Sequence, residues 1–200
     1  VREPVVLHGL DLVYMLWFPL LVVVVVWCGW SVRVRLRQRL LLSSLLTFIL
    51  IGTGGAYLLS SAGPCYYGRL VPGPDPFAEL MAALERRVDV EGALLFAVDN
   101  QRGIWEAWKE DRHLTFGGIS AMPSMHVAMA VLVALAAGAV DRRLGWVAWM
   151  FAGLTFLGSV ALGWHYAVDG YVGGLAAAAI WVWVGRWRSV RALPERFNAV

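Results

Sequence analysis

Charged residues are scarce in this chain. Only 16% of its 200 residues are Asp, Glu, Lys or Arg, whereas 60% are hydrophobic. Soluble domains carry about 25% charged residues, so a water-soluble fold of this length would lack the polar side chains needed to cover its surface. The composition therefore excludes an ordinary soluble domain and indicates a protein that lies in a lipid bilayer.

Cysteines, repeats and flexible linkers are also rare or missing. Of the two cysteines, Cys28 lies inside an apolar run and Cys65 in a more polar segment, so we expect no structural disulfide. No repeat or low-complexity linker divides the chain, and residues 1–200 are interpreted as one membrane-embedded domain. A cleavable signal peptide is not expected, because arginines rather than a small-residue cleavage site follow the first apolar run.

Five apolar runs are candidates for membrane spans. A helix needs about 20 predominantly apolar residues to cross a bilayer, and the candidate runs are 12–30, 40–60, 122–140, 146–163 and 168–185. Each is expected to be helical. The predicted fold class is therefore all-α, a polytopic membrane helix bundle with five visible spans.

Arginines cluster beside three of these runs, at 33–39, 142–143 and 186–191. By the positive-inside rule these three clusters face the cytoplasm. The three assignments are mutually consistent, because an even number of spans separates each cluster from the next. The first residue then lies outside, and we expect a sixth span before Val1. The arginines also explain the net charge of +3, so nucleic-acid binding is not inferred.

The long segment 61–121 is predicted to be an extracytoplasmic helical insertion. Asp75 and Pro76 are typical of a helix start, and apolar residues then recur at helical spacing up to Val88. This helix is expected to lie on the membrane surface or to cap the outer end of the bundle. The pattern over 93–108 fits either a hairpin or two short helices.

Two histidines and one aspartate are the candidate catalytic residues. His126 begins the third span and His165 precedes the fifth, so one helical hairpin brings both to the same side of the membrane. Asp169 follows His165 by one helical turn and can orient its imidazole. Helix N-termini attract anions. The arrangement favours phosphoryl transfer, with one imidazole attacking phosphorus and the other protonating the leaving oxygen.

A metal site is the alternative interpretation of the same three residues. His and Asp are zinc ligands, but the outer segment offers no additional cluster of ligands, so we expect neither a metal nor another cofactor. His8 and His113 are interpreted as structural or solvated residues. The eleven tryptophans are interpreted as belts at the membrane interface.

Two segments carry a resemblance to a known family. Residues 118–126 (Gly-Ile-Ser-Ala-Met-Pro-Ser-Met-His) and 158–169 (Gly-Ser-Val-Ala-Leu-Gly-Trp-His-Tyr-Ala-Val-Asp) resemble the second and third motifs of the type 2 phosphatidic acid phosphatase superfamily. More narrowly, they resemble its inositol phosphorylceramide synthase and sphingomyelin synthase-like branch, where Pro-Ser-x-His and His-Tyr-x-x-Asp recur. Residues 61–67 also resemble that branch, and the likeness covers roughly residues 10–185.

The resemblance implies a role for each candidate residue. It makes His165 the nucleophile that forms a phosphohistidine, Asp169 its orienting group, and His126 the general acid. It also implies a lipid phosphate ester as substrate. Within the two motifs, Ser124 and Tyr166 are expected to bind that substrate.

The chain departs from the family's pattern in two places. The third motif of the phosphatases usually begins with Ser-Arg, but Gly158 and Ser159 stand there, and the first motif, with its Lys and Arg-Pro, is not found. Other cations are then needed to neutralise the phosphate. Arg69 is the first candidate and Arg112 the second, although either could be an ordinary surface residue.

Two classes of function remain open. The favoured class is an enzyme in a bacterial plasma membrane, with its active site on the extracytoplasmic side, that transfers the phospho-group of a lipid to a hydroxyl or to water. The alternative is a catalytically silent membrane scaffold or transporter that binds lipid phosphate. The intact set of His126, His165 and Asp169 favours the enzyme.

Overall fold

The computed structural model describes residues 4–112 and 120–193, and nearly all of their regular structure is helical. The prediction of an all-α bundle is confirmed. The elements are α1 (Pro4–Met15), α2 (Trp17–Trp30), α3 (Val34–Thr47), the π-helix η1 (Phe48–Gly55), α4 (Ala56–Leu58), α5 (Pro64–Leu70), α6 (Ala78–Asp89), α7 (Phe96–Lys109), α8 (Met125–Val140), α9 (Arg142–Ala161), α10 (Ala167–Gly185) and α11 (Arg188–Arg191).

Four of the helical segments are long and apolar enough to cross a membrane, and they are Val5–Trp30, Val34–Leu58, Arg142–Ala161 and Ala167–Gly185. They correspond to four of the five predicted spans, with bounds shifted by a few residues at most ends. The remaining prediction, 122–140, is helical only as α8, which has 16 residues. It is shorter because Ser124 caps the helix at its start, accepting a hydrogen bond from the N–H of Val127.

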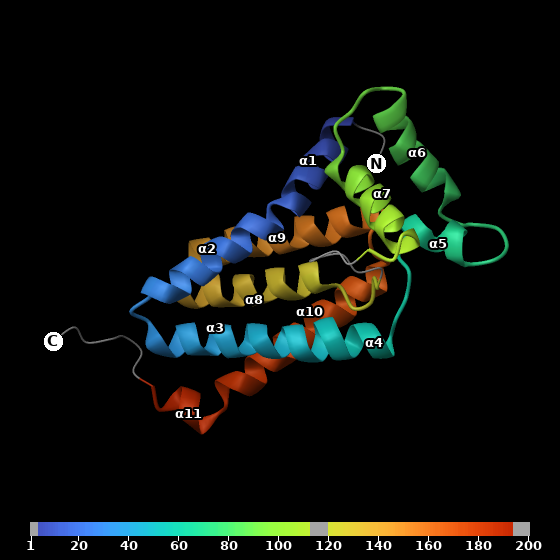
Figure 1. Cartoon of the computed structure of the whole chain (residues 1–200). Helices are drawn as coiled ribbons and strands as arrows, with labels where there is room; N and C mark the ends of the chain where they lie inside the picture. Colours follow the sequence, from blue (N-terminus) through green and yellow to red (C-terminus); the bar gives the residue numbers. More distant parts are fainter. Residues whose placement is uncertain (1–3, 113–119, 194–200) are drawn as a thin grey trace.

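The bundle is arranged around α8 (Figure 1), which packs against α3, α9 and α10. Half of its 16 residues are buried, including Ala128, Leu132 and Ala134. In Figure 1, α2, α3, α8 and α9 run side by side, and α5, α6 and α7 gather at one end of them, beside α1. A central helix that faces protein rather than lipid can be shorter than a full membrane span.

The first span is interrupted at Leu16, between α1 and α2. Pro19, in the first turn of α2, has no backbone N–H to donate to Met15, and its ring crowds that carbonyl. Hydrogen bonds from Leu16 N–H to Leu12 O and from Leu20 N–H to Leu16 O, both 3.0 Å, keep the two pieces in line. The span is therefore one helix with a local break close to His126.

The second span widens into the π-helix η1, where the sequence reads Ile-Gly-Thr-Gly-Gly. The hydroxyl of Thr53 donates to the carbonyl of Phe48, five residues earlier, at 3.3 Å. Two glycines of η1 lie against the motif segment 118–126. A Cβ at Gly52 would lie 3.2 Å from the sulfur of Met125, and one at Gly55 would lie 3.0 Å from the ring of Pro123. Such π-helical turns often accompany functional sites.

Within its described residues, 61–112 and 120–121, the predicted insertion contains three helices, α5, α6 and α7 (Figure 1). The helix expected after Asp75 is confirmed as α6, although it begins at Ala78, because the side chain of Asp75 first caps a turn by accepting the N–H of Phe77 at 2.8 Å. Both predictions for 93–108 are wrong, since this segment contains the single helix α7.

The start of α7 is fixed by a residue that the sequence pattern did not single out. Asp11 of α1 is fully buried, and its carboxylate accepts the N–H groups of Phe96 and Ala97 at 2.7 and 2.9 Å. A carboxylate at a helix N-terminus satisfies free donors and opposes the helix dipole. The cap comes from another helix 85 residues away, so local periodicity in 93–108 could not show it.

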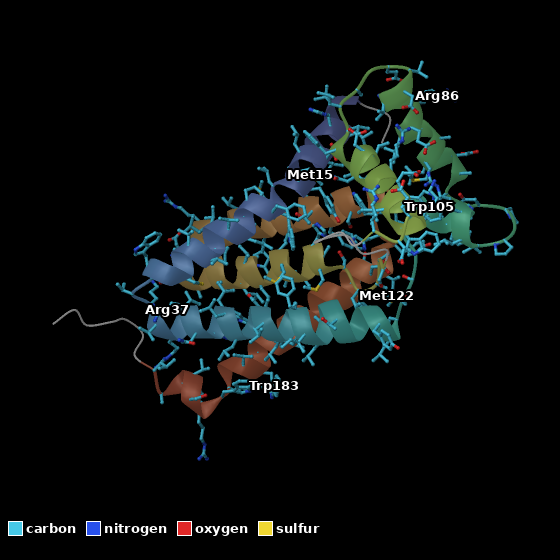
Figure 2. All side chains as sticks on the ribbon, in the orientation of Figure 1. Met15, Arg37, Arg86, Trp105, Met122 and Trp183 are labelled. Atoms are coloured by element: carbon cyan, nitrogen blue, oxygen red, sulfur yellow. The ribbon has the colours of Figure 1, made fainter. Side chains whose placement is uncertain are left out.

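The three arginine clusters lie at one end of the bundle. Arg33 donates to the carbonyls of Ala139 and Val140 at the end of α8, and Arg35 donates to Leu193 just after α11. Figure 2 shows Arg37 at this end and Arg86 at the opposite end. The alternation predicted from the arginines is thus present in the helix arrangement.

Candidate active site

The two motif segments meet at the starts of α8 and α10. The N–H of Ser124 donates to the carbonyl of Asp169 at 3.0 Å, which joins the two helix starts through their backbones. Gly173 makes this approach possible, because a Cβ at that position would clash with the carbonyl oxygen of Ser124. The glycine in α10 therefore sets the distance between the two motifs.

His165 is delivered to the site by a tight turn at the end of α9. Gly163 has a φ of +74°, which a side chain would strain, and it ends the helix. The N–H groups of Trp164 and His165 both donate to the carbonyl of Ser159 at 3.0 Å. Because the turn is closed by two backbone hydrogen bonds, the direction of the His165 side chain is well defined.

The imidazole of His165 has a fixed tautomer. Its Nδ1 lies 2.7 Å from the carbonyl oxygen of Ala121, and since a carbonyl only accepts, Nδ1 carries the hydrogen. In the neutral imidazole the lone pair is therefore on Nε2. His165 is only 8% exposed and lines the cavity described below, so a single basic nitrogen is available for chemistry there.

Asp169 lies near His165, but Ala121 is the closer partner of the His165 Nδ1. The carboxylate Oδ2 is 3.6 Å from Nδ1 and accepts the N–H of Tyr166 at 2.8 Å. The other oxygen, Oδ1, is buried and has no hydrogen-bond partner among the described residues. Asp169 therefore lies beside the imidazole without a hydrogen bond to it, whereas the backbone of Ala121 supplies the hydrogen bond.

His126 is enclosed by aromatic rings of the first span. Its ring stacks on Tyr14 at a centroid distance of 4.4 Å and lies 4.3 Å from the ring of Trp17. The indole N–H of Trp17 also donates to the backbone carbonyl of His126 at 3.1 Å. Neither aromatic was predicted from the sequence, although their spacing of three residues on one helix face was a usable signal.

The two histidines face each other across a gap. Their ring centroids are 6.3 Å apart, and the rings are inclined by 58°. The Nε2 atom of His126 is buried and has no hydrogen-bond partner within residues 4–112 and 120–193. Such an unsatisfied polar atom is costly unless a ligand uses it.

A cavity of about 840 Å³ adjoins both rings. Its volume falls within the usual range for ligand sites, about 300–1,000 Å³. His126, His165, Ser120, Asn100 and Thr53 are polar groups on its wall. The rest of the wall is largely apolar, and it is formed by Tyr14, Met15, Phe18, Phe48, Ile49, Gly52, Ala56, Gly63, Tyr66, Ile104, Ala121, Pro123, Met125 and Trp164. The cavity therefore combines two bases with a surface suited to a lipid chain.

The predicted phosphate-binding arginines are not brought to this cavity. The guanidinium of Arg69 lies over the ring of Trp105, 4.9 Å from its centroid. Arg112 forms an exposed ion pair with Glu110. Neither is among the described residues that line the cavity, and no lysine or arginine is. Their proposed role in binding phosphate is not supported by these positions.

Ser124 and Tyr166 have structural contacts in this structure. Ser124 is fully buried, and its hydroxyl caps α8. The ring of Tyr166 packs near Phe77, with centroids 5.4 Å apart, and its N–H bonds to Asp169. Both residues thus position the motif segments, and their direct contact with substrate remains a prediction.

Other potential nucleophiles near the site are poorly suited to attack. Burial raises the pKa of Cys65 to about 12, so its thiol is protonated at neutral pH. Burial also raises the pKa of Tyr66, and its hydroxyl donates to the carbonyl of Gln101 at 3.1 Å. The imidazole Nε2 of His165 is the stronger candidate.

Among the described residues, no group of three His, Cys, Asp or Glu side chains is placed to hold a metal ion. We expect activity to survive chelation, because the two imidazoles and one carboxylate suffice for nucleophilic and acid–base roles. The measurement is the initial rate before and after dialysis against EDTA. Loss of activity that only zinc restores would instead favour the metal interpretation.

Fold and site together define an α-helical membrane protein with two facing histidines beside a largely apolar cavity. The sequence model of the PAP2 superfamily matches residues 1–184, and the chain belongs to that superfamily. No curated protein and no solved structure gives a significant match. Membership supports a phosphatase or phosphotransferase that acts on lipid phosphates in a bilayer.

Proposed function

We propose that this protein cleaves a lipid phosphate ester through a phosphohistidine on His165, and that it transfers the phospho-group to a hydroxyl of an acceptor or to water. The observation that carries this proposal is the geometry of His165. Its Nδ1 is bonded to the carbonyl of Ala121 at 2.7 Å, which leaves the Nε2 lone pair for attack, and His126 lies 6.3 Å away between ring centroids.

In the first step, Nε2 of His165 attacks phosphorus, the Nε2–P bond forms, and the bond from phosphorus to the ester oxygen breaks. Protonated His126 gives its proton to that oxygen as it leaves. The imidazole of His165 becomes positively charged, and the nearby carboxylate of Asp169, 3.6 Å from Nδ1, stabilises that charge.

In the second step, neutral His126 accepts a proton from water or from an alcohol, whose oxygen attacks phosphorus. The Nε2–P bond breaks and its electron pair returns to His165. The rings of Tyr14 and Trp17, 4.4 and 4.3 Å from the His126 ring, hold the imidazole in place for this proton transfer.

The synthase-like branch of the superfamily is the more specific proposal. Gly158 and Ser159 replace the usual Ser-Arg of the phosphatases, and residues 61–67 resemble the synthases. Gly63 lies against the carbonyl of Trp164, beside His165, and Cys65 N–H donates to Gly163 O at 2.9 Å. This segment therefore supports the catalytic turn directly. The branch resemblance favours transfer to a hydroxyl over simple hydrolysis.

A panel of labelled lipids tests the proposed activity. Purified protein is incubated with phosphatidic acid, other glycerophospholipids and prenyl phosphates, with and without polyol or lipid alcohols. We expect release of the dephosphorylated lipid or diacylglycerol, and a new phosphorylated product that depends on the alcohol. Lipid binding without any product across the panel would instead favour the catalytically silent scaffold or transporter.

The orientation of the protein is proposed from the arginines, with the cavity on the outer side. In a background without Cys28 and Cys65, Glu110→Cys in the insertion should react with an impermeant thiol reagent in intact cells. Arg143→Cys, at the start of α9, is the matched control and should react only after lysis. Labelling in the opposite pattern would reverse the proposed orientation.

A separate prediction concerns Asp169, whose carboxylate accepts the N–H of Tyr166 and also lies near the imidazole of His165. Asp169→Asn retains an oxygen to accept the N–H of Tyr166 but removes the negative charge near His165. We expect kcat to fall on the order of 10⁴-fold, as for other carboxylates behind a catalytic histidine. Asp75→Asn, which changes a carboxylate at the start of α6, is the control. A loss below tenfold with an unchanged unfolding temperature would contradict the role of the charge.

A further inference from the structure

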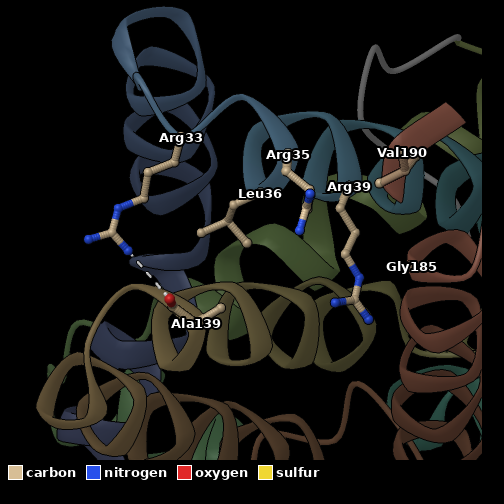
Figure 3. Close-up of a pocket in the computed structure, with 7 residues that line it drawn as sticks. All are labelled: Arg33, Arg35, Leu36, Arg39, Ala139, Gly185 and Val190. Carbon is tan, nitrogen blue, oxygen red and sulfur yellow. Dashed lines mark hydrogen bonds between the residues drawn. The ribbon is translucent and has the colours of Figure 1, made fainter. Parts of the chain in front are cut away.

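A second cavity, of about 330 Å³, lies at the opposite end of the bundle from His165. Figure 3 shows three arginines at the start of α3, Arg33, Arg35 and Arg39, that extend across it towards α8 and α10. The lining residues are Arg33, Arg35, Leu36, Arg39, Ala139, Gly185 and Val190. The cavity thus joins the beginning of one membrane span to the ends of two neighbouring helices.

The arginine head groups are held in place by carbonyls at helix ends. Arg39 donates from Nε and Nη2 to Trp181 O at 3.1 and 2.9 Å, and it lies 4.1 Å from the centroid of the Trp181 ring. Arg33 donates from Nη1 to Val140 O at 3.2 Å. These contacts fix the cations with little remaining side-chain freedom, so a ligand would lose less entropy on binding.

Two of the arginines, Arg33 and Arg39, are not neutralised by the described residues of the cavity wall. No carboxylate is among the described residues that line it. Neither Arg33 nor Arg39 forms an ion pair within residues 4–112 and 120–193. The carbonyl contacts of Arg33 use Nη1, and those of Arg39 use Nε and Nη2. Donors of both guanidiniums therefore remain for an anion.

We propose that this cavity binds the phosphate of an anionic membrane phospholipid. Guanidinium groups bind phosphate oxygens in a planar, paired geometry. The volume of about 330 Å³ lies at the lower end of ligand sites, about 300–1,000 Å³, so it suits a head group rather than a whole lipid. Leu36 and Val190 provide apolar contacts for the adjoining glycerol and upper chain.

The position of the cavity favours a lipid over a soluble phosphate. Arg35 and Arg39 lie in the first turns of the span Val34–Leu58, at the level where lipid head groups meet the hydrocarbon. Basic pockets between helices at this level bind acidic head groups.

The bound lipid would link α8, which carries His126, to α10, which begins just after His165. α8 begins beside His126 and ends at Ala139 and Val140, and α10 begins after His165 and ends at Gly185. A ligand between their far ends would stabilise the folded bundle, because it binds only the folded state. This site uses none of the proposed catalytic residues, and its test is independent of activity.

The experiment measures binding of dihexanoyl phosphatidylglycerol to the purified protein in neutral micelles, by calorimetric titration. The His165→Ala protein is used so that lipid is not consumed. Dihexanoyl phosphatidylcholine and glycerol 3-phosphate are the comparison ligands. We expect phosphatidylglycerol to bind more tightly than either and to raise the unfolding temperature.

Arg33→Gln should weaken this binding about fivefold, the factor that corresponds to roughly 1 kcal/mol for each basic residue near an anionic membrane surface. Arg33→Gln combined with Arg39→Gln should weaken it about 25-fold by the same estimate. Arg37→Gln is the matched control, because Arg37 bonds to Ser31 O at 3.3 Å and does not line the cavity. We expect less than a twofold change for it.

Three results would overturn the proposal. Phosphatidylcholine that binds equally well would show that the phosphate charge is not recognised. An equal loss in Arg33→Gln and Arg37→Gln would show general attraction to the basic segment, and equally tight glycerol 3-phosphate would assign the cavity to a soluble phosphate. If the double variant does not fold, Arg33→Gln alone and Arg39→Lys still give the comparison.

Discussion

His165→Asn is expected to abolish turnover, with a loss on the order of 10⁶-fold, as for removal of a catalytic nucleophile. The asparagine amide can still donate to Ala121 O, which His165 Nδ1 contacts at 2.7 Å, but it has no Nε2 lone pair. The fold should therefore persist while the chemistry is lost. The measurement is the initial rate of phosphate transfer or release, with the unfolding temperature determined in parallel.

His8→Asn is the matched control for this variant. The Nδ1 of His8 also contacts a backbone carbonyl, that of Leu94 at 3.0 Å, but His8 is exposed and does not line the cavity. The initial rate of phosphate transfer or release by the His8→Asn protein should stay within twofold of wild type. A folded His165→Asn protein that keeps more than a hundredth of the wild-type rate would contradict the assignment of the nucleophile.

His126→Gln is expected to slow cleavage of lipid phosphates by about 10²–10⁴-fold, the usual contribution of an acid–base group. The effect should depend on the leaving group, because an alkoxide needs a proton to depart whereas a nitrophenolate does not. With nitrophenyl phosphate, formation of the phosphoenzyme should fall less than tenfold. The measurement compares the two substrates in rapid-quench experiments on wild type and variant.

Glutamine is chosen because a side chain of similar length can remain between Tyr14 and Trp17, whose rings lie 4.4 and 4.3 Å from that of His126. The packing around the site should then change little. An equal loss with both substrates would contradict the role of His126 as proton donor and would assign it to binding or structure.

Much of the fold was predictable from apolar runs, because a membrane span needs length and hydropathy more than specific contacts. Local interruptions were harder to predict. The break at Leu16 depends on Pro19, and η1 depends on glycines and on Thr53 bonding to Phe48. The single helix α7 was missed because its cap, Asp11, comes from another helix.

The candidate site was only partly visible in the sequence. Topology placed His126 and His165 together, and the structure brings their rings to 6.3 Å. The carbonyl of Ala121 that fixes the tautomer has no side-chain signature, so no pattern could indicate it. Arg69 was chosen by position in the chain, but its exposed guanidinium stacks on Trp105 instead. Contacts between segments far apart in the chain determine both the tautomer of His165 and the position of Arg69.

The central claim, a covalent intermediate on His165, is tested most directly by mapping a trapped phosphoenzyme. Purified protein is mixed with a phosphorus-labelled substrate, quenched in alkali within one turnover, and digested for peptide mapping. The account predicts an acid-labile, alkali-stable label on the peptide that contains His165, absent in His165→Asn and present in His126→Gln. A label on His126, or the same label in His165→Asn, would contradict it.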